Sequence, residues 1–281
     1  MNQDKPIFIG GLHRSGTSLM RAIIGSHPTV AIYQTDLPLW RKFYNRYKDL
    51  DLNDANIREQ LIEKIFSDRK LEEAEVKLAR DTILASLNAE KHITCGLVFE
   101  HILRQYAKQI GRPRWGLKTP YNEFFADAIF AAYPTAKMIH LLRDPRDVAV
   151  SIKSRGWDLT ITQQAIDWKA SVKLAQQNQQ NYAGSYSVVR YEDLVSNPEA
   201  IIQQVCQVIE LDYTPDLLKM DRQIGWRGSN SRFSDLGWES QEISPAAMGR
   251  YTNALSVSEI EFFQSFLKDE MISLHYTLQP L

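Results

Sequence analysis

The chain has 281 residues, of which 33 are basic and 34 are acidic, so its formal net charge at pH 7 is −1. This balance argues against a protein that wraps nucleic acid or binds a membrane through a basic surface, because both need a large excess of positive charge. Two cysteines, Cys95 and Cys206, are too few for a disulfide framework and suit a reducing compartment. No apolar run approaches the roughly 20 residues of a membrane span, so we expect a cytoplasmic protein.

Short apolar runs alternate with amphipathic segments along the chain. Strands are predicted at residues 7–9, 115–118, 137–142 and 186–191. Helices are predicted at residues 19–24, 122–133, 145–152 and 162–180, and from residue 198 onward. This alternation predicts an α/β fold with a parallel sheet between two layers of helices.

One long helical segment interrupts the alternation. Residues 36–111 show helical spacing almost throughout, and they lie between the first two predicted strands. We interpret this segment as an insert that forms a cap on the acceptor side of a single domain, residues 1–281. Residues 226–250 are rich in Gly, Ser, Asn and Arg, and we expect a loop there.

Residues 11–18, Gly-Leu-His-Arg-Ser-Gly-Thr-Ser, follow the first strand and precede the first helix. The two glycines have the spacing of a P-loop, whose backbone N–H groups converge on an anion at the start of a helix. A nucleoside triphosphate site has Lys after the second glycine, where this chain has Thr17, and the cation is Arg14 within the loop. The pattern therefore favours an anion other than a triphosphate; the alternative is a plain turn whose hydroxyls cap the helix.

Residues 8–21 resemble the 5′-phosphosulfate loop of the sulfotransferases, and are closest to the branch of protein-tyrosine sulfotransferases and their bacterial homologues. The resemblance implies a P-loop-type fold and the donor 3′-phosphoadenylyl sulfate (PAPS), with adenosine 3′,5′-bisphosphate (PAP) as product and no metal. The residues implied to hold the 5′-phosphosulfate are Arg14, Ser15, Gly16, Thr17 and Ser18.

PAPS carries a 3′-phosphate, so the resemblance also implies a second anion site. Arg143 follows the strand at 137–142, and Ser151 and Arg155 lie four residues apart on the next helix. This spacing is similar to the 3′-phosphate motif of the family. The alternative is that these arginines form surface salt bridges with Asp144 and Asp147.

Further matches extend over nearly the whole chain and are weakest in the insert. Residues 115–120 are similar to the strand end that carries a lysine, here Lys118, in the family. The segment that begins at Tyr191 resembles the part that closes around the nucleotide. Arg250 matches a late basic residue of relatives.

The resemblance implies in-line sulfuryl transfer to a hydroxyl or amine, with Lys118 and Arg14 stabilising charge on the leaving phosphate. In the protein-tyrosine branch the general base is a glutamate whose position falls on Thr35 here, so the neighbouring Asp36 is our candidate. Asp36 could instead cap the helix that contains Trp40. His13 is a second candidate for the base.

The acceptor remains open among small molecules, carbohydrates and peptides with a hydroxyl group. Tyr33, Leu37, Trp40 and Tyr44 are candidates to line its pocket. Two other functions stay open: a P-loop kinase that uses a nucleotide, and a catalytically inactive relative that binds one.

Overall fold

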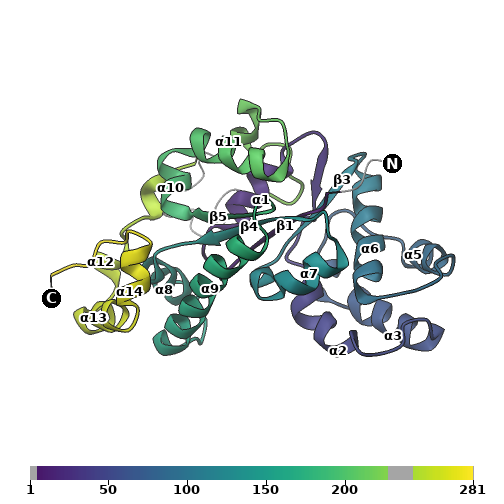
Figure 1. The fold of residues 1–281 in the computed structure, drawn as a ribbon, viewed down its shortest axis with the longest axis horizontal. Helices are drawn as coiled ribbons and strands as arrows, with labels where there is room; N and C mark the ends of the chain where they lie inside the picture. The colour runs from purple at the N-terminus through teal and green to yellow at the C-terminus, as the bar shows by residue number, and fades with distance from the viewer. Residues whose placement is uncertain (1–4, 227–242, 281) are drawn as a thin grey trace.

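The computed structural model describes residues 5–226 and 243–280, and its centre is a parallel sheet of five strands in the order β2-β3-β1-β4-β5 (Figure 1). The strands are β1 (Ile7–Gly11), β2 (Val30–Ile32), β3 (Arg114–Lys118), β4 (Lys137–Leu142) and β5 (Tyr186–Arg190). β1 and β4 are buried along their whole length, which explains why they read as continuous apolar runs. The predicted parallel α/β sheet flanked by helices is confirmed.

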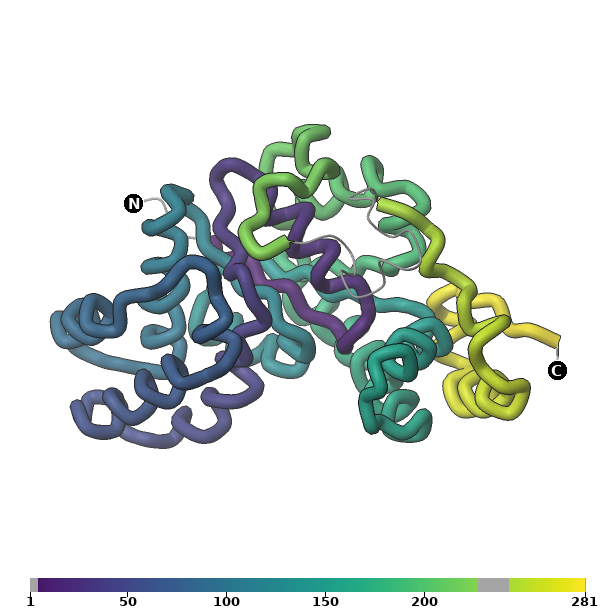
Figure 2. Tube along the Cα trace, turned by 180° about the vertical axis from the view of Figure 1, so that it is seen from behind, coloured from purple at the N-terminus to yellow at the C-terminus, as the bar shows by residue number. Residues whose placement is uncertain are grey.

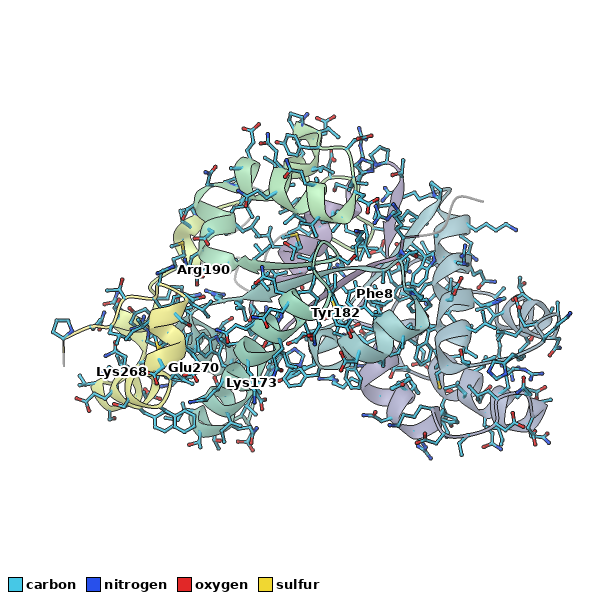
Figure 3. All side chains as sticks on the ribbon, viewed as in Figure 1. Phe8, Lys173, Tyr182, Arg190, Lys268 and Glu270 are labelled. Carbon is cyan, nitrogen blue, oxygen red and sulfur yellow. The ribbon has the colours of Figure 1, made fainter. Side chains whose placement is uncertain are left out.

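Helices cover both faces of the sheet (Figure 1). On one face, Ile7 and Ile9 of β1 pack with α1 (Thr17–Gly25) and α11 (Pro198–Ile209). On the other face, Phe8 packs with α6 (Cys95–Gln109) and α7 (Ala126–Ala132), and Figure 3 labels its side chain there. The alternation of side chains along β1 thus supplies two cores from one strand.

The helical insert follows β2, and this corrects our prediction that it lies between the first two strands. β2 has three residues, too few to give a periodic signal, and it pairs with β3 at the edge of the sheet. The insert consists of η1 (Leu39–Tyr44), α2 (Asn45–Tyr47), α3 (Ala55–Phe66), α4 (Arg69–Glu72), α5 (Arg80–Leu87) and α6. It is helical as predicted, and it lies at the opposite end of the molecule from the C-terminal helices (Figure 2).

The core of the insert contains residues that we expected to line a pocket. Tyr33, Leu37 and Trp40 are almost completely buried in one apolar cluster with Phe8. The rings of Trp40 and Phe8 meet edge to face at 6.4 Å between centroids. That part of the acceptor prediction is therefore wrong: these side chains hold the insert against the sheet.

The remaining elements follow the predicted order. They are η2 (Asn122–Phe125), α8 (Pro145–Lys153), α9 (Ile161–Asn181), α10 (Tyr191–Ser196), η3 (Pro215–Lys219), η5 (Pro245–Ala247), α12 (Tyr251–Ala254), α13 (Val257–Phe266) and α14 (Lys268–Ser273). Of the loop that we predicted at 226–250, residues 227–242 lie outside the described part. Within the described ranges, no helix has both the length and the apolar character needed to cross a bilayer.

Candidate donor and acceptor site

The loop between β1 and α1 has the backbone geometry of an anion cradle. Arg14 and Gly16 both have left-handed backbone conformations, with φ of 71° and 93°. Gly16 is the N-cap of α1, and as a glycine it has no side chain that could accept a hydrogen bond from the first N–H groups of this helix. Those donors are therefore available to a ligand, and the helix dipole favours a negative one.

Tyr191 lies directly on this loop. A Cβ atom added at Gly16 would lie 2.5 Å from Cδ2 of Tyr191, so only glycine fits beneath the ring. The ring also contacts Arg143, whose guanidinium lies 4.4 Å from the ring centroid. Tyr191 thus joins the loop to the predicted second anion site.

Direct hydrogen bonds also connect the two predicted anion sites. Arg14 donates from Nε to Oγ of Ser151 at 2.8 Å, and Arg143 donates to the carbonyl oxygen of Arg14 at 3.1 Å. Burial, followed by the positive charges of Arg155 and Arg143, lowers the pKa of Arg14 to about 10. Arg14, Arg143 and Arg155 therefore form a cluster of like charges, which an anion would stabilise.

The two acidic residues near Arg143 bind other groups. Asp144 pairs with Arg146 at 2.7 Å and caps α8. Asp147 accepts hydrogen bonds from the backbone N–H groups of Gly249 and Tyr251 at 2.7 and 3.1 Å. The alternative, in which Arg143 forms salt bridges with these carboxylates, is not supported: among the described residues its guanidinium donates to the backbone carbonyls of Arg14 and Ala247, and only its charge acts on Asp147.

Lys118 and Asp36 form an ion pair beside the start of α1. Lys118 is only 1% exposed, so it is not the solvated lysine that a strand end often carries. Its Nζ donates to Asp36, and also to Oγ of Ser18 at 3.2 Å. Asp36 keeps 36% of its side chain exposed. The helix after it has Pro38 as N-cap, so Asp36 does not cap that helix.

The pair has opposed effects on its two members. Burial lowers the pKa of Lys118 to about 8, although the charge of Asp36 raises it. Burial also raises the pKa of Asp36, but Lys118 and the nearby Arg21 outweigh it and hold this pKa below its usual range. At neutral pH the pair is therefore charged, with Asp36 as a carboxylate that can accept a proton.

Arg250 is the predicted site residue that the structure does not connect to the others. It lies at the start of α12, partly exposed, and its guanidinium makes no hydrogen bond or ion pair with the other described residues. The preceding residue, Gly249, donates its backbone N–H to Asp147 of α8. Arg250 therefore lies near α8, but this contact does not connect it to the loop between β1 and α1.

Four aromatic side chains beside the loop form a group that sequence reasoning missed. The ring of His13 meets those of Tyr121 and Trp157 edge to face, both at 5.2 Å between centroids, and Tyr121 contacts Phe124 at 5.7 Å. We call these four residues the aromatic strip. Trp157 and Phe124 are 45% and 40% exposed. They come from three separate segments, so no local pattern could have linked them.

The electrostatics place the aromatic strip next to the Lys118–Asp36 pair. Burial, and then Arg41, lower the pKa of His13 to about 4, and the charges of Asp36, Lys118 and Arg14 also act on it. His13 is therefore neutral at pH 7. Its Nε2 lies 3.4 Å from the guanidinium of Arg41, which makes it a poor candidate for the general base.

Comparison with known proteins agrees with this geometry. The model of the family described as "Sulfotransferase family" matches residues 6–215, about three quarters of the chain. The chain belongs to the sulfotransferase family. Protein-tyrosine sulfotransferase A of Caenorhabditis elegans is 27% identical over 232 residues, which are 80% of this chain and 55% of that protein. Protein-tyrosine sulfotransferase 1 of Danio rerio is 26% identical over 239 residues, or 82% of this chain and 60% of that protein. The chain thus spans little more than half the length of these two relatives.

Solved structures of the family share the fold. The sulfotransferase domain of the curacin biosynthetic pathway has a TM-score of 0.63 and 19% identity, and the match covers 98% of this chain and 99% of that one. A mouse sulfotransferase solved with PAP has a TM-score of 0.52 and 12% identity, over 95% of this chain and 85% of that one. These matches confirm the predicted fold, and membership of the family makes the protein a transferase.

Proposed function

We propose that this sulfotransferase moves the sulfuryl group of PAPS to a hydroxyl acceptor, and that its acceptors carry an aromatic ring. The observation that carries the donor is the hydrogen bond between Arg14 and Ser151, which joins two cationic sites on neighbouring strand ends. A nucleotide with one anionic group at its 5′ end and another at its 3′ position matches such a pair. ATP has no group for the second site.

Several features of the chain fit the donor. The uncapped start of α1 offers backbone N–H groups to the 5′-phosphosulfate, and Gly16 lets the loop pack closely under Tyr191. Among the described residues, the buried Nε of Arg143 has no hydrogen-bond partner, and a 3′-phosphate can accept a hydrogen bond from it. In this proposal Ser151 and Arg155 complete the second site.

The reaction needs one bond to form and one to break. The acceptor oxygen attacks sulfur in line, the new O–S bond forms, and the bond from sulfur to the bridging phosphate oxygen breaks. The hydroxyl proton passes to the carboxylate of Asp36, and Lys118 and Arg14 neutralise the charge that develops on the departing phosphate. PAP and the sulfated acceptor are the products.

The ion pair also suggests how donor binding activates the base. Lys118 holds the pKa of Asp36 down while the two are paired. A donor anion beside Ser18 competes for the same ammonium group, which is 3.2 Å from Oγ of Ser18. Weakening of the pair raises the pKa of Asp36, and its carboxylate becomes a stronger base only when the donor is present.

The aromatic strip supports a ring-bearing acceptor. Exposed aromatic side chains stack on planar apolar groups. The strip is linked to the proposed base through His13, which contacts Tyr121 and Trp157 and is close enough to Asp36 for the charge of Asp36 to act on it. Two relatives are named protein-tyrosine sulfotransferases, so a peptide tyrosine is one acceptor of this kind. A small phenol is another, and Trp157 would contact either.

Thermal unfolding with PAP, ADP, ATP and GTP tests the donor. We expect PAP to stabilise the protein well beyond ADP without Mg²⁺; equal or greater stabilisation by ATP with Mg²⁺ would favour a kinase and refute the proposal. Turnover is then measured with PAPS on p-nitrophenol, a tyrosine peptide and a monosaccharide. PAP binding without transfer to any of them would favour an inactive relative.

A further inference from the structure

A buried carboxylate lies directly beneath the phosphate loop. Glu123 belongs to η2, just after β3, and its side chain is 0% exposed. One oxygen, Oε2, accepts a hydrogen bond of 2.6 Å from the backbone N–H of Gly11, the residue where β1 ends and the loop begins. A Cβ atom at Gly10 would lie 2.9 Å from the same oxygen. The carboxylate is therefore packed against the backbone that leads into the anion cradle.

No described cation balances this carboxylate. The part of β1 that faces Glu123 is backbone. From α9 (Ile161–Asn181), Ser171 donates to Oε1 of Glu123 at 3.2 Å, and Asn178 donates to the backbone carbonyl of Glu123 at 3.3 Å. His140 of β4 lies 4.0 Å away, but burial lowers its pKa to about 3, so it is neutral. The other titratable groups nearby are the phenols of Tyr186 on β5 and Tyr121 beside η2.

The hydrogen bonds around Glu123 form a chain that can run in either direction. With Glu123 ionised, Tyr186 donates to His140, His140 donates to Ser171 at 2.9 Å, and Ser171 donates to the carboxylate. With Glu123 protonated, the carboxyl donates to Ser171, which donates to His140 Nε2, so the proton of the neutral His140 ring moves to Nδ1, on the side of Tyr186. Both protonation states thus satisfy the buried groups between Glu123 and His140. The site can gain a proton by rotation of the Ser171 hydroxyl and a change of the His140 tautomer.

We infer that Glu123 takes up a proton when the donor nucleotide binds, and that this proton controls the affinity for the donor. The donor brings several negative charges to the loop that begins at Gly11, and an ionised carboxylate without a cation partner repels them in a site of low dielectric constant. Protonation removes the repulsion while Oε2 still accepts from Gly11. Burial raises the pKa of Glu123 to about 7, although the hydrogen bonds that it accepts lower this pKa. Both the protonated and the ionised form are therefore accessible near neutral pH.

Glu123→Gln tests this inference, which rests on the proposed PAPS function for the identity of the ligand. Gln has the shape of the protonated acid: its Oε1 can accept from Gly11 and its amide can donate to Ser171. At pH 6 we expect wild type and variant to bind PAP equally well. At pH 8.5 the variant should bind about tenfold more tightly, as expected when ligand binding raises the pKa of Glu123 by about one unit. A residue with only a structural role would weaken binding in the variant at every pH.

Calorimetric titration with PAP at pH 7.5, in buffers of different ionisation enthalpy, counts the protons taken up. Wild type should take up more protons per PAP than the variant; contributions from the 3′-phosphate and Lys118 are common to both and cancel in the difference. Ser171→Ala, which removes the donor to Oε1 but keeps the bond to Gly11, should move the loss of affinity to higher pH. Equal proton uptake and parallel pH profiles in wild type and Glu123→Gln would overturn the inference, whereas failure of wild type to bind PAP at any pH would instead refute the proposed donor.

Discussion

Arg14 Nε and Ser151 Oγ are 2.8 Å apart, although 137 positions separate the two residues in the chain. This hydrogen bond joins the loop after β1 to the helix after β4, and β1 and β4 are neighbours in the sheet. In a parallel sheet, the carboxyl ends of neighbouring strands meet at one edge, so the loop and the helix start share that edge. The bond therefore links the proposed 5′ and 3′ sites, and changes at one should affect ligands at the other.

The first prediction concerns Arg143, the proposed ligand of the 3′-phosphate. Arg143→Ala should lower the affinity for PAP by about 10- to 100-fold, since a hydrogen bond to a charged group contributes about 1.5–3 kcal/mol. The affinity for ADP, which has no 3′-phosphate, should change much less. Calorimetric titration with both nucleotides measures the ratio. Lys153→Ala, which removes an exposed cation from α8, the helix that follows Arg143, is the matched control and should leave the ratio unchanged. A preserved preference for PAP in Arg143→Ala would mean that the 3′ site lies elsewhere.

The second prediction concerns Asp36. Asp36→Asn should reduce kcat by about 10²- to 10⁴-fold, the usual contribution of a general base, and leave PAP binding largely intact. It should also move the alkaline limb of the remaining activity to lower pH, because Asp36 raises the pKa of Lys118, which now lies at about 8. A pH profile of kcat under saturating donor checks both effects. Asp36→Glu retains a carboxylate and should recover part of the rate; full activity in Asp36→Asn would remove this residue from the mechanism.

Local sequence pattern was sufficient for much of the fold. The strand predicted at 137–142 matches β4 because it is apolar and buried on both faces. The start of α8 was readable because Asp144 and Pro145 act within one turn. β2 was missed because three residues give no period. The phosphate loop could be found because its glycines and Arg14 are contiguous.

The rest of the candidate site depends on contacts between distant segments. From the neighbouring sequence, Asp36 could be either a general base or the cap of the next helix. The structure excludes the cap, because the Asp36 carboxylate pairs with Lys118, 82 positions away in the chain. Likewise, the aromatic strip combines His13 with Trp157, and each looks like an isolated residue in the sequence. The burial of Trp40 could not be separated from a pocket position, because an apolar stripe on a helix has the same pattern in both cases.

The third prediction concerns Gly16. Gly16→Ala should destabilise the protein and impair PAP binding, because the methyl group would meet the Tyr191 ring at 2.5 Å and the backbone has φ of 93°. Gly184→Ala is the control for backbone strain alone: φ is 75° there, and a Cβ atom would meet nothing within 4 Å. Denaturant unfolding should show a loss of about 1 kcal/mol in the control and a larger loss in Gly16→Ala. Equal losses would mean that the ring of Tyr191 moves away without cost.

The fourth prediction concerns the aromatic strip. Trp157→Ala should raise KM for p-nitrophenol or a tyrosine peptide by about three- to tenfold, because a ring contact contributes about 0.5–1.5 kcal/mol beyond its buried area. KM for PAPS should not change. Phe266→Ala, an exposed aromatic residue on α13, is the control and should affect neither constant. An unchanged KM for both aromatic acceptors would show that they bind away from the strip.

The last prediction needs no ligand and concerns how much ionisation of the buried Glu123 lowers the free energy of unfolding. Burial raises the folded-state pKa of Glu123 from 4.5 to about 7, so the stability that this group contributes is complete below about pH 4.5 and is lost as pH rises through about 7. Glu123→Gln cannot ionise. The free energy of unfolding of wild type, relative to this variant, should therefore fall by about 3 kcal/mol between pH 4.5 and pH 8. Urea unfolding at several pH values measures the difference, and other groups that titrate in both proteins cancel. A difference that stays constant with pH would mean that the pKa of the folded Glu123 is not raised above that of the unfolded chain. The carboxylate would then be ionised near neutral pH and would not be poised to take up a proton when the donor binds.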